Sequence, residues 1–232
     1  MSPTAKIAAD LVSLVRTRAK PAALAWFAAA VADLDPVRER GHFLSALAAA
    51  GRRLGRDPVV PDRTEGDRLA AAGLSPFPPG LGLDECGRGA LILLAFDRLP
   101  ASERVQLASD LYHRGEVRER QALLRVLAYL PAPAGFRELA VEACRTSVQS
   151  VFEAIACENP YPAAHFPEAS FNQMVLKAVF TGLALPRIAG LPERVTPDLV
   201  RMAEDYAAER RAAGRALPAD MDLIFSAGTR SA

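Results

Sequence analysis

The amino-acid sequence predicts an all-α protein, either an irregular helical array or a HEAT-like α-solenoid, with no β-sheet. Almost every segment repeats its apolar residues at the spacing of one helix face. The expected helices are joined by short connectors, so consecutive helices should lie antiparallel and pack in series. No sequence repeat of fixed length is present, so the HEAT-like architecture is inferred from the helices and their connectors alone.

Residues 1–56 are expected to form N-terminal helices. Ser2 and Pro3 offer a helix cap and a proline in the first turn. An alanine-rich helix should follow from Pro21. A third helix should end at Gly55, after two arginines that suit the negative end of the helix dipole.

Residues 57–83 are rich in proline and are expected to be a connector with one short helical piece at residues 67–72. The main helical domain is expected over residues 84–225. Within it, Ala90–Phe96 is apolar on all sides, which indicates a helix enclosed by other helices. We predict that these three parts form one compact unit.

The composition is that of an ordinary folded protein. Half of the 232 residues are hydrophobic and the net charge is +1, so no global charge draws the chain to nucleic acid. The N-terminal part is modestly basic, because up to Arg56 it holds nine Lys and Arg against four Asp and Glu. The three cysteines are widely spaced, which fits neither a disulfide framework nor a zinc motif and favours a reducing compartment.

The sequence also favours a cytoplasmic location. Charges at Lys6, Asp10 and Arg16 interrupt the first apolar stretch, so that stretch lacks the form of a secretion signal. No apolar run approaches the roughly 20 residues that a membrane-spanning helix needs. We therefore expect a cytoplasmic protein without a transmembrane segment.

The stretch from Phe152 to Phe180 is the candidate functional site. Two helical runs, each with one apolar face, flank a polar connector in which Pro160 and Pro162 fix φ and stiffen the loop. The candidate ligand-binding side chains are Cys157, Asn159, Tyr161, His165, Asn172, Gln173 and Lys177. Those of Asn159, Tyr161, His165 and Asn172 are expected to line one concavity, with Lys177 at its edge.

Cys157 and His165 are the only cysteine and histidine that lie close together in the sequence, and they are the candidate nucleophile and base. Catalysis would need the imidazole within hydrogen-bond reach of the thiol. Cys157 follows Phe152 by five residues, so it should lie off the buried face, beside Glu153, and be accessible. The alternative is an inert structural cysteine, since cysteine is among the most commonly buried residues.

A metal site could be assembled from Glu153, Cys157, Glu158 and His165, because zinc accepts thiolate, imidazole and carboxylate ligands. The spacing matches no known zinc motif. Glycine-rich phosphate loops are also absent. We predict no metal, no cofactor and no catalytic residues.

The remaining candidates have two interpretations each. Asn159 and Asn172 could bind a ligand, or they could hold the backbone of the turns, as Asn commonly does. Lys177 follows Gln173 by one helical turn. These two side chains could bind an anionic or carbonyl-bearing ligand, or they could form a solvated helix face.

Four segments of the chain resemble the EboA family over residues 115–220. They are ACENPYP at 156–162 with HF at 165–166, FNQMVLKA at 171–178, DYA at 205–207 and ERR at 209–211. The resemblance implies a bacterial protein encoded with a prenyltransferase-like membrane protein and several metal-dependent or sugar-phosphate-type enzymes. It also implies a cluster associated with moving metabolite precursors out of the cytoplasm. No catalytic residue is carried over from the family.

Two hypotheses follow. The first is a non-catalytic helical binding or scaffold protein whose partners are a small metabolite and other proteins of the cluster, and not nucleic acid. The basic N-terminal part also predicts a peripheral contact with an anionic membrane, and vesicle flotation at low and moderate salt would test it. The second is an enzyme of the same pathway that uses Cys157 with His165 or a carboxylate.

Overall fold

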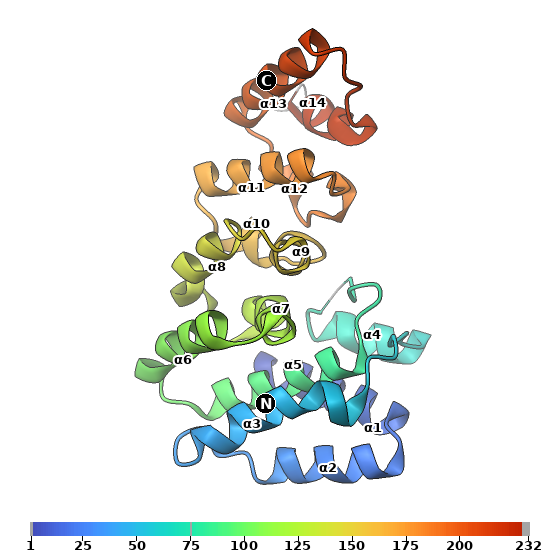
Figure 1. Cartoon of the computed structure of the whole chain (residues 1–232), viewed down its shortest axis with the longest axis vertical. Coiled ribbons are helices and arrows are strands. Elements are labelled where there is room, and N and C mark those ends of the chain that lie inside the picture. Colours follow the sequence, from blue (N-terminus) through green and yellow to red (C-terminus); the bar gives the residue numbers. More distant parts are fainter. Residues whose placement is uncertain (1, 75, 229–232) are drawn as a thin grey trace. The chain divides into compact units, whose positions relative to one another are not determined.

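The computed structural model describes residues 2–74 and 76–228 (Figure 1). Within these residues the chain forms α-helices and short 3₁₀ turns and no strand, so the predicted all-α helical array is confirmed. One isolated antiparallel bridge joins Pro58 and Gly82. The chain divides into two compact units, residues 1–139 and 140–232. The divisions at residues 56 and 83 stay predictions.

The described residues of the first unit form seven complete α-helices. They are α1 (Pro3–Arg18), α2 (Pro21–Ala32), α3 (Arg40–Leu54), α4 (Arg63–Ala71), α5 (Leu83–Arg98), α6 (Ala101–Arg114) and α7 (Val117–Val126), followed by the 3₁₀ turns η1 (Leu127–Tyr129) and η2 (Pro133–Phe136).

Helix α5 is the centre of this unit and packs against α1, α3 and α7. From Ala90 to Phe96 every side chain except that of Leu94 is buried, which confirms the predicted enclosed helix. Gly89 lets the neighbours approach closely, since a Cβ there would lie 3.1 Å from Val126 Cγ1 and 3.2 Å from Leu11 Cδ1. Close packing of this kind stabilises the core through many small dispersion contacts.

A buried group of charges, here called the Asp84 cluster, joins α5 to α7. Asp84 is 0% exposed, and its carboxylate is bound by Arg88 and by Arg118, whose Nη2 lies 2.5 Å from Oδ1. The Glu85 carboxylate forms ion pairs with two arginines. Arg118 Nη2 lies 3.2 Å from its Oε2, and Arg125 Nε lies 3.3 Å from its Oε1. Every member therefore has a partner of opposite charge, which a buried ion requires.

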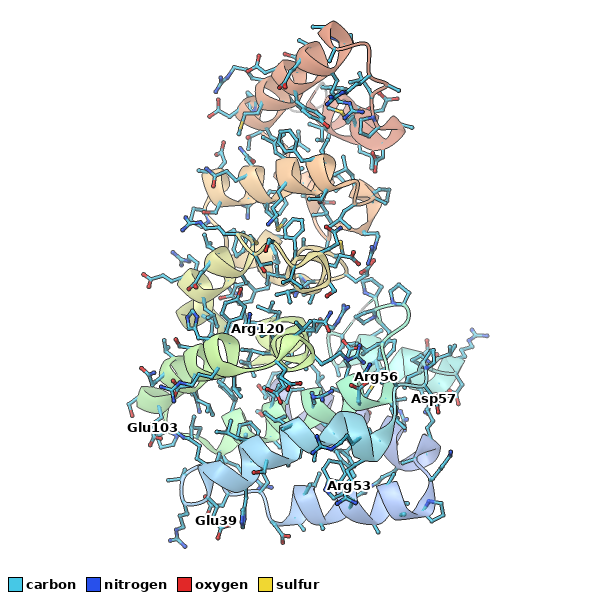
Figure 2. The ribbon with its side chains drawn as sticks, in the orientation of Figure 1. Glu39, Arg53, Arg56, Asp57, Glu103 and Arg120 are labelled. Atoms are coloured by element: carbon cyan, nitrogen blue, oxygen red, sulfur yellow. The ribbon has the colours of Figure 1, made fainter. Side chains whose placement is uncertain are left out.

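The proline-rich connector holds α4, which begins at Arg63 and not near residue 67 as predicted. The reason is a capping box, in which Asp62 accepts from the Glu65 N–H and the Glu65 carboxylate accepts from the Asp62 N–H. Glu65 also binds Arg18 of α1, at 2.5 and 2.9 Å. In Figure 2, Arg56 and Asp57 mark the point where the chain leaves α3 for this connector.

The Glu65–Arg18 pair predicts a specific pH dependence of stability. The Arg18 guanidinium lowers the pKa of Glu65 from its ordinary 4.5 to about 2. A lowered native pKa favours folding above the unfolded value, and this contribution is lost as the pH falls from about 4.5 towards 2. Over that range the urea midpoint of the wild type should fall more steeply than that of Glu65→Gln, which keeps the capping box. If the urea midpoints of the wild type and Glu65→Gln fall equally with pH, the Glu65–Arg18 pair does not stabilise the fold in this way.

The second unit begins within α8 (Arg137–Ala143). Its other elements are α9 (Gln149–Ala156), α10 (Tyr161–His165), α11 (Glu168–Thr181), η3 (Leu185–Arg187), α12 (Leu191–Arg194), α13 (Pro197–Ala212), η4 (Ala219–Met221) and α14 (Asp222–Gly228). Helix α11 packs against α9 and α13, and α14 packs against α12 and α13. The predicted apolar face of α11, from Phe171 to Val179, is buried and forms the centre of the unit.

Candidate functional site

The connector between α9 and α11 is held by an ion pair at its start. Glu158 has φ +48°, a left-handed conformation that is uncommon outside glycine. Its N–H donates to the Arg187 carbonyl at 2.8 Å, and its carboxylate binds the Arg187 guanidinium at 2.7 and 3.0 Å. This pairing raises the pKa of Arg187. Glu153 Oε2 also lies 3.4 Å from Arg187 Nη1. The two carboxylates near Cys157, those of Glu153 and Glu158, are therefore both paired with Arg187.

Asn159 holds the turn that follows. Its Nδ2 donates to the Ala154 carbonyl at 2.9 Å, and its Oδ1 accepts from the Tyr161 N–H at 3.0 Å. The Asn159 side chain therefore holds the backbone of the turn, which was the alternative to ligand binding in the interpretation of the sequence. Tyr161 is buried, and its ring lies 4.7 Å from that of His165 and 6.2 Å from that of Phe166, measured between centroids.

The expectation that Cys157 is accessible is wrong, because the residue is 0% exposed. The expectation assumed an ideal helix. The chain leaves the helix at Cys157, whose φ of −109° and ψ of 140° are extended. A second cysteine of this unit, Cys144, is also buried. Desolvation raises the pKa of its thiol to about 12, so the thiol stays protonated near neutral pH.

Arg194 of α12 fixes the end of α10. Its two Nη atoms donate to the Ala163 and Phe166 carbonyls, at 2.5 and 2.9 Å. The guanidinium carbon also lies 4.7 Å from the centre of the Phe171 ring. A cation at a helix C-terminus satisfies carbonyls that have no partner within the helix. No pattern in the sequence indicates this contact.

Asn172 of α11 is 2% exposed, and its Nδ2 lies 3.3 Å from Oγ1 of Thr196, the residue that caps α13. Its Oδ1 has no hydrogen-bond partner within residues 2–74 and 76–228. Through the contact of its Nδ2 with Thr196, the Asn172 amide links α11 to the start of α13.

Lys177 of α11 closes the C-terminal end of α8. Its Nζ donates to the Cys144 carbonyl at 2.6 Å and to the Thr146 carbonyl at 2.5 Å. It also lies 4.5 Å from the centre of the Phe152 ring. Partial burial lowers the pKa of Lys177, while the two carbonyls and the ring face favour its charged form.

One pocket in the second unit, here called the Lys177 pocket, lies beside this contact and has a volume of about 240 Å³. It is lined by Val141, Cys144, Arg145, Ser170, Gln173, Met174 and Lys177. Two of the predicted site residues, Gln173 and Lys177, are thus brought together. Cys157, Asn159, Tyr161, His165 and Asn172 do not line it. The single concavity predicted for the connector stays a prediction.

Sequence reasoning missed Arg145 and Ser170 as pocket residues. Ser170 lies on α11 one turn before Gln173, so helical spacing could have identified it. Arg145 lies beyond α8, and no pattern in the sequence connects it to α11. The pocket lining carries two cations, Arg145 and Lys177, and no carboxylate, so it favours an anionic group.

Two further properties concern the part of the chain that the structure describes. No group of three or more His, Cys, Asp or Glu residues there could hold a metal ion. None of the described helices combines the length and the apolar character that crossing a membrane would need.

Comparison with known proteins identifies the family. Residues 7–224 match the family described as metabolite traffic protein EboA, which is nearly the whole chain. The match extends well beyond residues 115–220, the range over which the sequence resembles the family. No curated protein and no solved structure matches the chain significantly. The chain therefore belongs to the EboA family of metabolite traffic proteins.

Proposed function

We propose that the protein is a non-catalytic helical binding or scaffold protein of a bacterial biosynthetic gene cluster, and that it assists the movement of a small-molecule precursor from the cytoplasm. The family supplies the general role of metabolite traffic. The observation that carries the proposal is the Lys177 pocket, a preformed hollow with two cations and no acid in its lining. Such a hollow suits the anionic group of a small metabolite.

The size of the pocket indicates how much of a ligand it would hold. Its volume of about 240 Å³ lies below the roughly 300 to 1,000 Å³ of sites that enclose a drug-sized molecule. Lys177 already donates to two carbonyls, so it supplies charge more than hydrogen bonds. Arg145 and Gln173 are exposed and supply the donors. The pocket is therefore suited to a small anionic molecule or to the anionic end of a larger one.

The competing hypothesis is an enzyme that uses Cys157. A nucleophilic thiol must reach its substrate as a thiolate. Cys157 is fully buried, and the adjacent Glu158 carboxylate is occupied by Arg187. These two observations favour the binding protein over the enzyme.

The scaffold part of the proposal concerns other proteins of the cluster. Helix α2 contains no charged residue, and only Phe27 of it is buried. Exposed apolar surface of this kind is typical of surfaces that contact other molecules. Contact with an anionic membrane stays a prediction.

The proposal predicts that the full chain, purified gently from cells that express its own cluster, retains a small acidic molecule in native mass spectrometry. Arg145→Gln removes one pocket cation at an exposed position and should reduce the retained fraction about tenfold. Arg211→Gln, an exposed arginine of α13 outside the pocket, is the matched control and should retain the molecule fully.

The scaffold branch has its own readout, which is co-purification of proteins encoded in the same cluster. A chain that carries no small molecule and recovers no cluster protein would rule out both branches. Retention that is equal in the wild type and in Arg145→Gln would exclude the Lys177 pocket as the site.

A further inference from the structure

A second and larger pocket lies in the first unit, where the start of α1, the junction of α5 and α6, and the segment after α7 meet. Its volume is about 460 Å³, which falls within the usual range of small-molecule sites. We propose that this hollow, here called the Arg104 pocket, binds a small monocarboxylic acid with an apolar body. It shares no residue with the Lys177 pocket, so the inference does not rest on the proposed function.

The polar groups of the Arg104 pocket are partly used by the fold. Arg104 donates from Nε to the Phe96 and Leu99 carbonyls, at 3.2 and 3.0 Å, which fixes its guanidinium at the end of α5. Its two Nη atoms have no hydrogen-bond partner in residues 2–74 and 76–228, and neither has the Tyr129 hydroxyl. Burial raises the pKa of Tyr129 to about 12, so this hydroxyl stays a donor near neutral pH.

The start of α1 adds a further attraction for an anion. Pro3 and Thr4, the first two residues of this sixteen-residue helix, line the pocket. The first-turn N–H groups of a helix have no partner within it and carry the positive end of its dipole. Ser2 caps the N–H of Ala5, and Thr4 Oγ1 is occupied by the Tyr129 carbonyl at 2.7 Å. Within residues 2–74 and 76–228 the backbone N–H of Thr4 has no hydrogen-bond partner, so it is open to a ligand.

The two Nη atoms of the Arg104 guanidinium determine which anion fits the pocket best. Two Nη atoms in a fixed plane match the two oxygens of a carboxylate. Asp97 also lines the pocket, where its Oδ1 accepts from the Ser2 hydroxyl at 2.7 Å. With one cation and one carboxylate in the lining, a group of charge −1 is tolerated better than a phosphate of higher charge.

The rest of the wall is apolar and rigid. Ile7, Leu130, Pro131 and Pro133 contribute to it, and the two prolines fix the backbone that carries them. Between them Ala132 has φ +55°, a left-handed conformation that the surrounding turns maintain. A preformed apolar wall binds the carbon body of a ligand with little loss of conformational entropy.

The test uses 4-phenylbutyrate as the probe and isothermal titration of the full chain. The acid should bind about tenfold more tightly than 4-phenylbutyramide, which has the same shape without the charge. Arg104→Gln should remove this preference for the acid. Tyr129→Phe deletes a hydroxyl that has no partner among the described residues, so it should leave the melting temperature unchanged and weaken binding of the acid about threefold.

Two controls locate the site. Arg114→Gln alters an arginine of α6 whose side chain is 83% exposed, and Arg211→Gln alters an exposed arginine of α13 outside both pockets; both should bind the probe like the wild type. Equal binding of acid and amide, unchanged binding in both Arg104→Gln and Tyr129→Phe, or no binding of the acid at millimolar concentration would each overturn the inference. Loss of binding in Arg145→Gln alone would also overturn it, while leaving the proposed function supported.

Discussion

Replacing Asp84 by alanine should lower the free energy of unfolding of the first unit by about 3–5 kcal/mol. Asp84 is fully buried and binds both Arg88 and Arg118. Its removal leaves the buried Arg88 guanidinium without its carboxylate and takes one of the two carboxylates from the partly exposed Arg118. Urea unfolding followed by the fluorescence of Trp26, the single tryptophan and a residue of this unit, measures the change.

The matched control for this prediction is Glu103→Ala. Glu103 also lies in the first turn of a helix in the same unit and pairs with Arg40 at 2.9 Å, but the two side chains are 40% and 37% exposed (Figure 2). Exposed pairs contribute about 0–1 kcal/mol, so this variant should unfold close to the wild type. If the two variants unfold at the same urea concentration, the Asp84 cluster does not hold α5 to α7.

Replacing Lys177 by methionine should lower the stability of the second unit by about 2 kcal/mol. The ammonium binds the Cys144 and Thr146 carbonyls, and methionine leaves both without this donor while keeping most of the apolar stem. Hydrogen exchange of the α8 and α11 amides, read by mass spectrometry, measures the loss in the affected elements.

Gln173→Ala is the control, because Gln173 is exposed and lies one turn earlier on the same helix. It should change protection by less than about 0.5 kcal/mol. Unchanged exchange in Lys177→Met would mean that the lysine is available for a ligand, which is one of its two interpretations from the sequence, and that it does not hold α8.

The features that the sequence predicted correctly are those that local chemistry determines. Ala90–Phe96 is apolar on all sides, so its burial follows from composition alone. The apolar face of α11 follows from helical spacing in the same way. The start of α4 was placed too late, because the helix is initiated by the capping box of Asp62 and Glu65 and not by its apolar residues.

The features that the sequence could not provide depend on contacts between distant segments. The Asp84 cluster joins residues more than thirty positions apart along the chain, and single charges carry no mark of such partners. Cys157 is buried because the backbone leaves the helix at that residue, which helical spacing does not reveal. The Arg104 pocket is assembled from four separate segments, and none of them has a binding motif of its own.

The central claim is that the protein holds a small metabolite without transforming it. The most direct measurement incubates the full chain with the molecule that it retains on purification and compares the mass of that molecule before and after. We expect the molecule to be recovered unchanged, with retention reduced in Arg145→Gln. A new mass that accumulates with time in the wild type and is absent in Cys157→Ala would contradict the claim, since it would show that the protein is an enzyme.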